Sequence, residues 1–310
     1  MREIQRAGHL RFHCVGDTGG LENPAPQRNV AAAMVAELSG DPVRFFYHLG
    51  DIVYLHGEEA GYLPQFLEPY AEYASPIFAI PGNHDGDRAP GSNAGSLQAF
   101  IDHFCTATPI GPSREARFER AGIGQPNVYW TLVHDWITIV GLYTNVPDGG
   151  RIGDDQLRWL TSELRAARSG ATLILALHHP VYSADSVHGS NLALGHLLDQ
   201  SFALADRAPD AMFAAHAHNY QRFTRTYLGR EIPYVVAGTG GFHTLHEMGT
   251  GIAQTPARFD GISDVKLEVY QDQGFGFMTV TAGPGGAEVS YSVVKRDVAK
   301  PFDRFSIAPR

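Results

Sequence analysis

Residues 43–54 read VRFFYHLGDIVY, and this stretch decides the fold. Its mostly apolar and aromatic first half predicts a buried β-strand over residues 43–49, and Gly50-Asp51 follows where that strand ends. A polar residue placed directly after a buried strand lies at the edge of a sheet, where it can meet side chains from neighbouring strands. Asp51 is therefore the first candidate for a functional site.

Four other segments repeat this arrangement, because each follows an apolar, β-branched or aromatic run and carries residue types that bind metals. They are Gly16-Asp17-Thr18-Gly19-Gly20, Gly82-Asn83-His84-Asp85, Leu175-Ala176-Leu177-His178-His179-Pro180 and His216-Ala217-His218-Asn219. Carboxylate, imidazole and amide oxygen all bind metal ions, and two cations held close together need a bridging anion such as a carboxylate. In an extended segment, His216 and His218 point to the same side. The five segments together predict a metal centre.

Length and composition are those of a globular protein. The chain has 310 residues, of which 44% are hydrophobic and 18% are charged. Length alone allows one large domain or two ordinary ones. Because the five segments span most of the chain, we expect a single domain over residues 1–310, with loop excursions at 86–127 and 242–265.

Charge and targeting signals limit the partners. The formal net charge of −9 disfavours binding to nucleic acid or to an anionic membrane, so bound metal must supply the positive charge that an anionic substrate needs. No stretch approaches the roughly 18 uncharged apolar residues of a membrane span. The first residues contain no apolar signal core, which predicts a cytoplasmic protein, or a periplasmic or secreted one if a signal has been removed. Oligomeric state is left open.

The pattern of apolar residues predicts an α/β fold, a four-layer α-β-β-α sandwich of two packed mixed sheets flanked by helices. The opening is β-α-β, with strands at 10–15 and 43–49 around a helix that carries Ala31 to Leu38. The other expected strands are 76–80, 128–133, 136–143, 172–177, 211–215 and 234–237, followed by a closing antiparallel set of 266–270, 275–281 and 288–294. Further helices are expected near 62–73, 157–164 and 194–205. The long loop 86–127 is expected to form a lid or pocket rim, or else to be mobile.

The five segments resemble the metallophosphoesterases of the calcineurin-like superfamily, and more narrowly the purple acid phosphatases. That family carries the series Asp-x-Gly, Gly-Asp-x-x-Tyr, Gly-Asn-His-Asp/Glu, x-x-x-His and Gly-His-x-His. This chain departs from the series at Ala215, where the family has Gly, which adds a methyl group and leaves the ligands in place. The broader superfamily has His two residues after the first Asp. Here Gly19 occupies that position and Tyr54 is present instead, which is the specific mark of the purple branch.

The resemblance implies a centre of two metal ions. The first ion would be held by Asp17, Tyr54 and His218, and the second by Asn83, His178 and His216, with Asp51 bridging. A phenolate ligand favours Fe³⁺ at the first site, and the second would hold Fe²⁺, Zn²⁺ or Mn²⁺. Phenolate bound to ferric iron colours the resembling enzymes, so the oxidised protein is expected to be violet or pink. The alternative for Tyr54 is a core aromatic residue.

Several further residues near these segments are candidates for catalysis. By the same resemblance, His84 and His188 would hold phosphate oxygens or protonate the leaving alkoxide, with either assignment open. Asp85 could orient His84 through a hydrogen bond. His179 would point away from His178 if that segment is extended. For His246, contact at the rim of the site and plain surface both stay open.

The function that the resemblance implies is hydrolysis of a small-molecule phosphate ester by metal-bound hydroxide, with inorganic phosphate as product. A phosphomonoesterase comes first, and a phosphodiesterase or phosphotriesterase on the same metals is the close alternative. A different class is a redox or metal-binding di-iron protein, against which His84 and His188 count, since electron transfer does not need them. A third is a scaffold that binds partners without catalysis, which the full ligand set disfavours.

Overall fold

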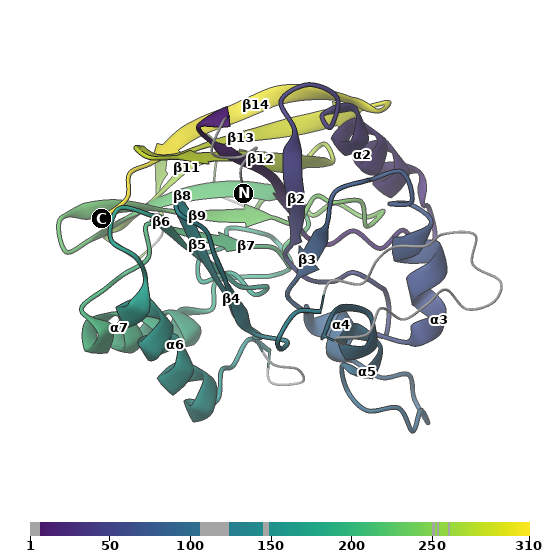
Figure 1. The fold of residues 1–310 in the computed structure, drawn as a ribbon, viewed down its shortest axis with the longest axis horizontal. Coiled ribbons are helices and arrows are strands. Elements are labelled where there is room, and N and C mark those ends of the chain that lie inside the picture. Colours follow the sequence, from purple (N-terminus) through teal and green to yellow (C-terminus); the bar gives the residue numbers. More distant parts are fainter. Residues whose placement is uncertain (1–6, 106–123, 145–148, 250–251, 253, 260) are drawn as a thin grey trace.

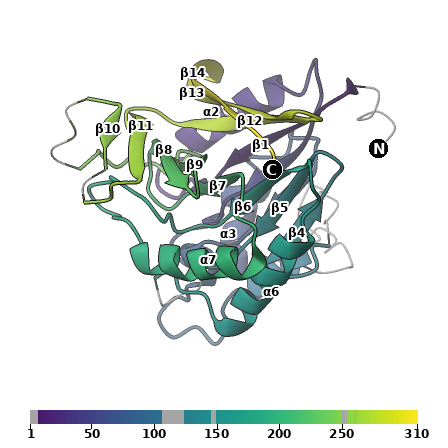
Figure 2. The same cartoon turned by 90° about the vertical axis from the view of Figure 1, so that its left-hand side faces the viewer.

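The computed structural model describes residues 7–105, 124–144, 149–249, 252, 254–259 and 261–310. Two mixed β-sheets pack face to face, and helices cover their outer sides (Figures 1 and 2). The predicted α/β fold of two packed mixed sheets flanked by helices is confirmed.

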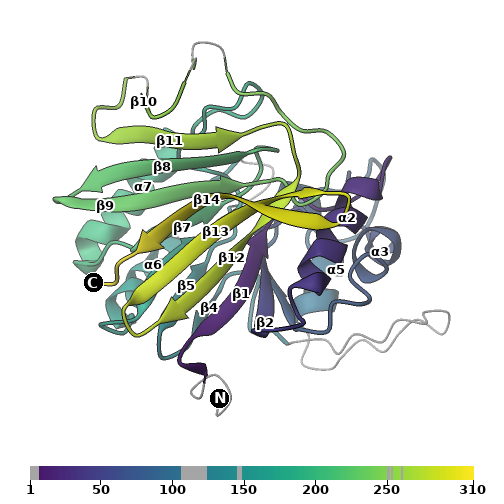
Figure 3. The same cartoon turned by 90° about the horizontal axis from the view of Figure 1, so that it is seen from above.

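The six-stranded sheet has the order β14-β13-β12-β1-β2-β3, and Figure 3 looks down onto it. Its strands are β1 (Leu10–Val15), β2 (Val43–His48), β3 (Ile77–Ala79), β12 (Gly276–Gly283), β13 (Gly286–Lys295) and β14 (Val298–Ile307). The pairs β1–β2 and β2–β3 are parallel, whereas β1 and the strands β12 to β14 are joined by antiparallel pairs.

The eight-stranded sheet has the order β10-β11-β8-β9-β7-β6-β5-β4. Its strands are β4 (Trp130–Val133), β5 (Ile137–Gly141), β6 (Thr172–Ala176), β7 (Ala211–Ala214), β8 (Tyr220–Tyr227), β9 (Arg230–Ala237), β10 (Ala257–Arg258) and β11 (Val265–Gln271). Strands β5, β6, β7 and β9 run parallel to one another. The strands outside this parallel block pair in antiparallel fashion.

The helices form the two outer layers. They are α2 (Ala25–Ala36), α3 (Glu59–Tyr62), η1 (Leu63–Leu67), α4 (Asn83–Gly86), α5 (Gln98–Phe100), η2 (Ile101–Cys105), α6 (Asp154–Ala166) and α7 (Leu192–Ala205), where η marks a turn of π-helix. Helices α6 and α7 cover the outer face of the eight-stranded sheet, as Figure 2 shows. Among the described residues, no helix combines the length and the apolar character that crossing a bilayer requires.

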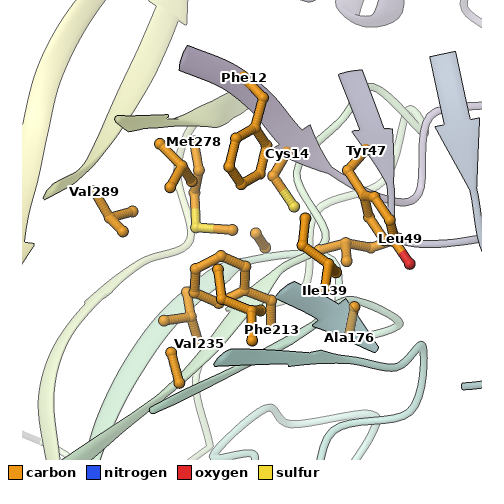
Figure 4. Packing of buried hydrophobic residues seen from close by; sticks show 14 of the residues in the cluster. Phe12, Cys14, Tyr47, Leu49, Ile139, Ala176, Phe213, Val235, Met278 and Val289 are labelled. Carbon is orange, nitrogen blue, oxygen red and sulfur yellow. The ribbon is translucent and has the colours of Figure 1, made fainter. Parts of the chain in front are cut away.

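Side chains alternate between the hydrophobic cores of the layers. Along β6, Ile174 and Ala176 enter the core between the sheets, whereas Leu173 and Leu175 pack against α6 and α7. The core between the sheets is drawn in Figure 4, where Phe12 and Met278 of one sheet face Phe213 of the other. Because both faces of these strands are buried, their sequences are almost continuously apolar, and this is why the pattern predicted them correctly.

Parallel strands bring the five segments together. In a parallel sheet the carboxyl ends of all strands lie along one edge, and ligands bind in the crevice outside that edge. Asp17, Asp51 and Asn83 lie just beyond β1, β2 and β3, and His178 and His216 lie just beyond β6 and β7. Packing of the two sheets therefore places both edges around one site.

The predicted closing set of three antiparallel strands is partly wrong. Strand β11, expected over 266–270, pairs with β8 and belongs to the other sheet, while β12 and β13 pair as expected. Strands β8 and β14 were not predicted, since their sequences, YQRFTRTY and VAKPFDRFSI, alternate charged and apolar residues too irregularly. Strand partners depend on contacts between distant residues, which local periodicity does not contain.

The two predicted loop excursions contain secondary structure. Within 86–127, α5 and η2 bury Phe100 and Phe104 in the core beneath the six-stranded sheet, while residues 106–123 lie outside the described residues. Within 242–265, β10 pairs with β11, and residues 250, 251, 253 and 260 lie outside the described residues. The role of 86–127 as a lid or pocket rim stays a prediction.

Replacing Gly82 by Ala is expected to destabilise the protein by about 1–3 kcal/mol. A Cβ at this position would lie 2.1 Å from Asp51 Oδ1 and 2.4 Å from the Asp51 nitrogen. Urea unfolding measures the effect, with Gly285→Ala as the control, because a Cβ there meets no described atom within 4 Å. Equal unfolding midpoints for the two variants would contradict this close approach.

Candidate metal centre

Three of the predicted ligand residues have a backbone conformation that non-glycine residues rarely adopt. Asp17, Asp51 and His216 have φ angles of 56°, 55° and 69°, in the left-handed region. Such conformations persist only where the surrounding structure holds them, and they concentrate at functional sites. Here the Asp17 N–H donates to the Gly50 carbonyl at 3.0 Å, and the His216 N–H donates to Asp17 Oδ2 at 2.8 Å.

A first group of donors consists of Asp17, Tyr54 and His218. The Tyr54 hydroxyl donates to Asp17 Oδ1 at 3.1 Å and lies 3.4 Å from His218 Nε2. His218 Nε2 lies 3.6 Å from the same carboxylate oxygen. All three side chains are almost fully buried.

A second group consists of Asp51, Asn83, His178 and His216. His178 Nε2 lies 3.1 Å from Asn83 Oδ1 and 3.2 Å from Asp51 Oδ2. One donor atom each from Asp51, His178 and His216 lie within 4.8 Å of one another. The bond from His216 to Asp17 joins this group to the first. The structure thus brings all seven predicted ligand residues together, and their binding of metal stays a prediction.

The two central histidines are oriented by backbone carbonyls. His178 Nδ1 donates to the Leu49 carbonyl at 2.9 Å, and His218 Nδ1 donates to the Thr244 carbonyl at 3.0 Å. With Nδ1 bound to a backbone carbonyl, Nε2 is the ring nitrogen that faces the other donors, which is the arrangement of metal-binding histidines.

The charges in this pocket also suit cations. The ion-pair partners of Asp17 and Asp51 among the described residues are histidines. Burial lowers the pKa of His178, but the Asp51 carboxylate outweighs this and raises the pKa to about 9. Without metal, a proton on His178 Nε2 would pair with Asp51, and metal binding would displace it. The donor set of oxygen and imidazole groups fits two borderline or hard cations.

Gly19 and Tyr54 share one space. A Cβ at Gly19 would lie 2.6 Å from Gln65 Oε1 and 2.7 Å from Tyr54 Cδ2, so the Gln65 amide and the Tyr54 ring together fill the volume that a side chain at position 19 would need. The Tyr54 ring is held between Phe242, at 4.1 Å between ring centroids, and His84, at 4.4 Å.

Ala215, the departure from the family series, packs against Gly16, where a Cβ would lie 2.6 Å from the Ala215 methyl group. The extra methyl group is accommodated because residue 16 has no side chain.

Comparison with known families agrees with this arrangement. The family model for calcineurin-like phosphoesterases matches residues 10–220. The chain belongs to this family. The matched residues contain both groups of donors, from Asp17 to His218.

The curated relatives of this phosphoesterase are plant purple acid phosphatases. Purple acid phosphatase 22 of Arabidopsis thaliana is 23% identical over 245 residues, covering 75% of this chain and 50% of the plant protein. Purple acid phosphatase 21 is 27% identical over 178 residues, covering 54% of this chain and 36% of that protein. The chain spans about half the length, or less, of the curated relatives it matches. This similarity supports a purple acid phosphatase-like phosphoesterase.

Solved structures share the fold. The purple acid phosphatase PPD1 from yellow lupin superimposes with a TM-score of 0.69 at 19% identity, over 97% of this chain and 54% of the lupin chain. GAP50, described as the anchor in the inner membrane complex of Plasmodium, also gives 0.69, at 14% identity, over 97% of this chain and 89% of that one. Since one of these proteins is described as an anchor, the fold alone does not assign catalysis.

His84 and His188 contact the two groups of donors from different sides. His84 packs on Tyr54, and its Nδ1 donates to the Leu55 carbonyl at 2.7 Å. The ring centroid of His188 lies 4.0 Å from that of His216 and 6.5 Å from that of His218. In this phosphoesterase both predicted histidines are therefore next to the proposed ligands.

The predicted hydrogen bond between Asp85 and His84 is wrong. The buried Asp85 carboxylate accepts the backbone N–H groups of Ile52, Val53 and Gly82, at 2.8 to 3.3 Å. It joins the loops that carry Asp51 and Asn83, and the Leu55 carbonyl orients His84 instead. Neighbours in sequence point apart here because residues 83–86 form a helical turn, α4.

His179 lies closer to the centre than predicted. Strand β6 ends at Ala176 and the chain bends at residues 178–179, so His179 does not point away. Its ring centroid lies 4.4 Å from that of His216, and its Nδ1 is 2.8 Å from Thr144 Oγ1. The histidine pair in the sequence was the signal, but only the turn after β6 brings both rings to His216.

A network around Asp185 was missed. The buried Asp185 carboxylate accepts the His188 N–H at 2.7 Å and His246 Nδ1 at 3.1 Å. His246 stacks on His218 with 4.3 Å between ring centroids, and its N–H donates to the His218 carbonyl at 3.0 Å. Asn219 donates to Asp185 as well, at 3.0 Å. The sequence left open whether His246 lies at the rim of the site or on plain surface. In the structure its ring lies next to that of His218.

Asp185→Asn is expected to lower kcat by about tenfold or more, with the metal content unchanged. The amide loses the charge that holds His188 and His246, while every proposed ligand stays in place. Steady-state kinetics and elemental analysis measure the two quantities. Asp272→Asn is the matched control, because Asp272 accepts the Met248 N–H of the same loop and its hydrogen bonds among the described residues involve neither histidine. Equal kcat values for both variants would contradict a positioning role for Asp185.

Proposed function

We propose that this phosphoesterase is a two-metal phosphomonoesterase that converts a small-molecule phosphate ester into an alcohol and inorganic phosphate. The observation that carries the proposal is the meeting of two groups of mostly buried donors at the carboxyl ends of strands from both sheets. Both His178 and His218 direct Nε2 at carboxylate and neutral oxygen donors, with Nδ1 bound to a backbone carbonyl.

In this proposal the ligands divide as the resemblance implies. Asp17, Tyr54 and His218 would hold Fe³⁺, and Asn83, His178 and His216 would hold Fe²⁺, Zn²⁺ or Mn²⁺, with Asp51 between them. Burial raises the pKa of Tyr54 far above its ordinary value, so a strongly charged cation is needed to ionise the phenol. When bound, such ions lower the pKa of water, orient the phosphoryl group and stabilise the charge of the leaving oxygen.

Side chains of the protein would complete the reaction. His84 has a free Nε2 beside the first group, and His188 lies beside the second. Both can hold phosphate oxygens or give a proton to the leaving alkoxide.

The assay that tests the proposal uses metal-loaded protein with aryl phosphate mono-, di- and triesters. We expect the monoester to be hydrolysed fastest, with the activity lost on chelation and restored by metal. A faster diester or triester would replace the monoesterase by its close alternative. Absence of hydrolysis by protein that holds both metals would favour a redox or scaffold role.

We also propose that residues 1–310 form one phosphoesterase domain. The core between the sheets contains residues from Leu10 to Ile307, so the C-terminal strands complete the same core as the N-terminal ones. The net charge of −9 disfavours nucleic acid and anionic membranes as partners.

A further inference from the structure

The three histidines among the proposed ligands are not held in the same way. Nδ1 of His178 and Nδ1 of His218 are bound to backbone carbonyls, whereas the ring of His216 has no hydrogen-bond partner among the described residues. Only the backbone N–H of His216 is bound, to Asp17. His216 also lines a cavity of about 440 Å³, so part of its side chain faces open space. The orientation of the His216 ring therefore depends on the rings that pack against it.

Two other imidazole rings pack closely on His216. The centroid of its ring lies 4.4 Å from that of His179 and 4.0 Å from that of His188. The ring of His188 is only partly buried and forms no hydrogen bond within the described part of the chain. His179, in contrast, is only 6% exposed and its ring is hydrogen-bonded. Of the two neighbours, His179 is thus the one whose own position is fixed.

His179 is held from several directions. Its Nδ1 lies 2.8 Å from Thr144 Oγ1, and its backbone N–H donates to the same oxygen at 3.3 Å. Gly150 approaches it so closely that a Cβ on this glycine would lie 3.1 Å from His179 Cβ. The ring of His178 stands edge-on to it, with 5.2 Å between centroids. A ring fixed in this way restricts the rotation of His216, because close-packed side chains turn only if their neighbours move.

We infer that His179 is a positioning residue, which holds the His216 ring in the orientation that binding of the second metal ion requires. The inference rests on the proposed function, in which His216 is a ligand of that ion together with Asn83 and His178. Groups that orient a metal-binding histidine commonly change the metal affinity by roughly 10- to 100-fold. At the other two histidines a backbone carbonyl has this role, and at His216 the contact with a neighbouring ring takes its place.

Binding of Zn²⁺ by the metal-free protein tests the inference, with a chromophoric chelator as competitor. Wild-type protein should bind two ions in separable steps. His216→Ala identifies the step that belongs to the second ion, because this variant lacks one of its ligands. We expect His179→Ala to weaken that same step by about tenfold or more and to leave the other step within about twofold. General damage to the structure would weaken both steps, so a selective loss separates positioning from destabilisation.

Val181→Ala is the matched control for loss of a buried side chain in the same segment. Val181 is 3% exposed and packs on α7, where a Cβ at Gly195 would lie 2.8 Å from Val181 Cγ1. This variant should keep both binding steps within about twofold of the wild type. His179→Phe provides the rescue, since it keeps a ring beside His216. It should bind the second ion more tightly than His179→Ala by about threefold or more.

Thr144→Val keeps the test decisive if His179→Ala does not fold. Valine has nearly the shape of threonine but lacks the hydroxyl that fixes His179, so the second step should weaken by about threefold. Unchanged affinity of this step in Thr144→Val or in folded His179→Ala would overturn the inference, as would a His179→Phe protein no better than His179→Ala. A wild-type protein that binds fewer than two ions would instead overturn the two-metal function itself.

Discussion

Asp51→Ala should lower kcat for phosphate monoesters by about a thousandfold or more and remove at least one metal ion from the protein. Asp51 is 1% exposed, and its two oxygens serve different partners. Oδ2 lies 3.2 Å from His178 Nε2, and Oδ1 accepts the His84 N–H at 2.9 Å. Alanine removes the proposed bridge, leaves the His84 N–H without its acceptor and takes away the negative charge that offsets two cations.

Elemental analysis and kcat measure this effect. The control is Asp135→Ala, since Asp135 lies in the turn between β4 and β5, where it pairs with Arg168 at the protein surface. Loss of an exposed ion pair is worth at most about 1 kcal/mol, so the control should keep both metals and full activity. An Asp51→Ala protein with wild-type metal content and turnover would contradict the proposed centre.

Tyr54→Phe should abolish the visible absorption of the oxidised protein while leaving it folded. In the resembling purple enzymes the colour comes from phenolate bound to ferric iron, and phenylalanine has no oxygen to bind. The fold should tolerate the change, because the phenyl ring still fills the space between Phe242 and His84. The variant loses the hydroxyl that donates to Asp17 at 3.1 Å, so weaker iron binding is expected as well.

Tyr62→Phe is the matched control for the colour. Tyr62 is fully buried and, like Val53, belongs to the core beneath the six-stranded sheet. The Tyr62 hydroxyl has no hydrogen-bond partner among the described residues. The Tyr62→Phe variant should keep the colour and the stability of the wild-type protein. Visible spectra, iron content and thermal unfolding compare the two variants. A colourless wild-type enzyme that is active with zinc or manganese alone would exclude ferric iron and leave the phosphoesterase proposal intact.

Several elements of the fold were predictable from local sequence, for an identifiable reason. Strands such as β5 and β6 are buried on both faces, so they consist of apolar runs that any periodicity analysis finds. Strands β8 and β14 were missed because each exposes part of its length and carries charges there. The sheet to which β11 belongs was wrong, because strand pairing is decided by long-range packing.

The candidate site divides in the same way. Residues such as Asp17, Asp51 and His216 follow apolar strands in recognisable segments, so the surrounding sequence is sufficient to predict them as site residues. Asp185 and His246 stand in segments without a comparable pattern, and their importance comes only from being next to His188 and His218 in space. For Asp85 the sequence suggested the wrong partner, since one turn of helix separates the directions of adjacent side chains.

The sequence by itself determined the set of donors and the strands that carry them, because short local segments of apolar and metal-binding residues are sufficient to predict both. What only the tertiary structure decided is how these donors divide into two groups, which other histidines surround them and that a cavity lies beside His216. The physical reason is distance along the chain. Asp17 and His216 are joined by a 2.8 Å hydrogen bond across 199 residues, and only the packing of two sheets brings such residues into contact.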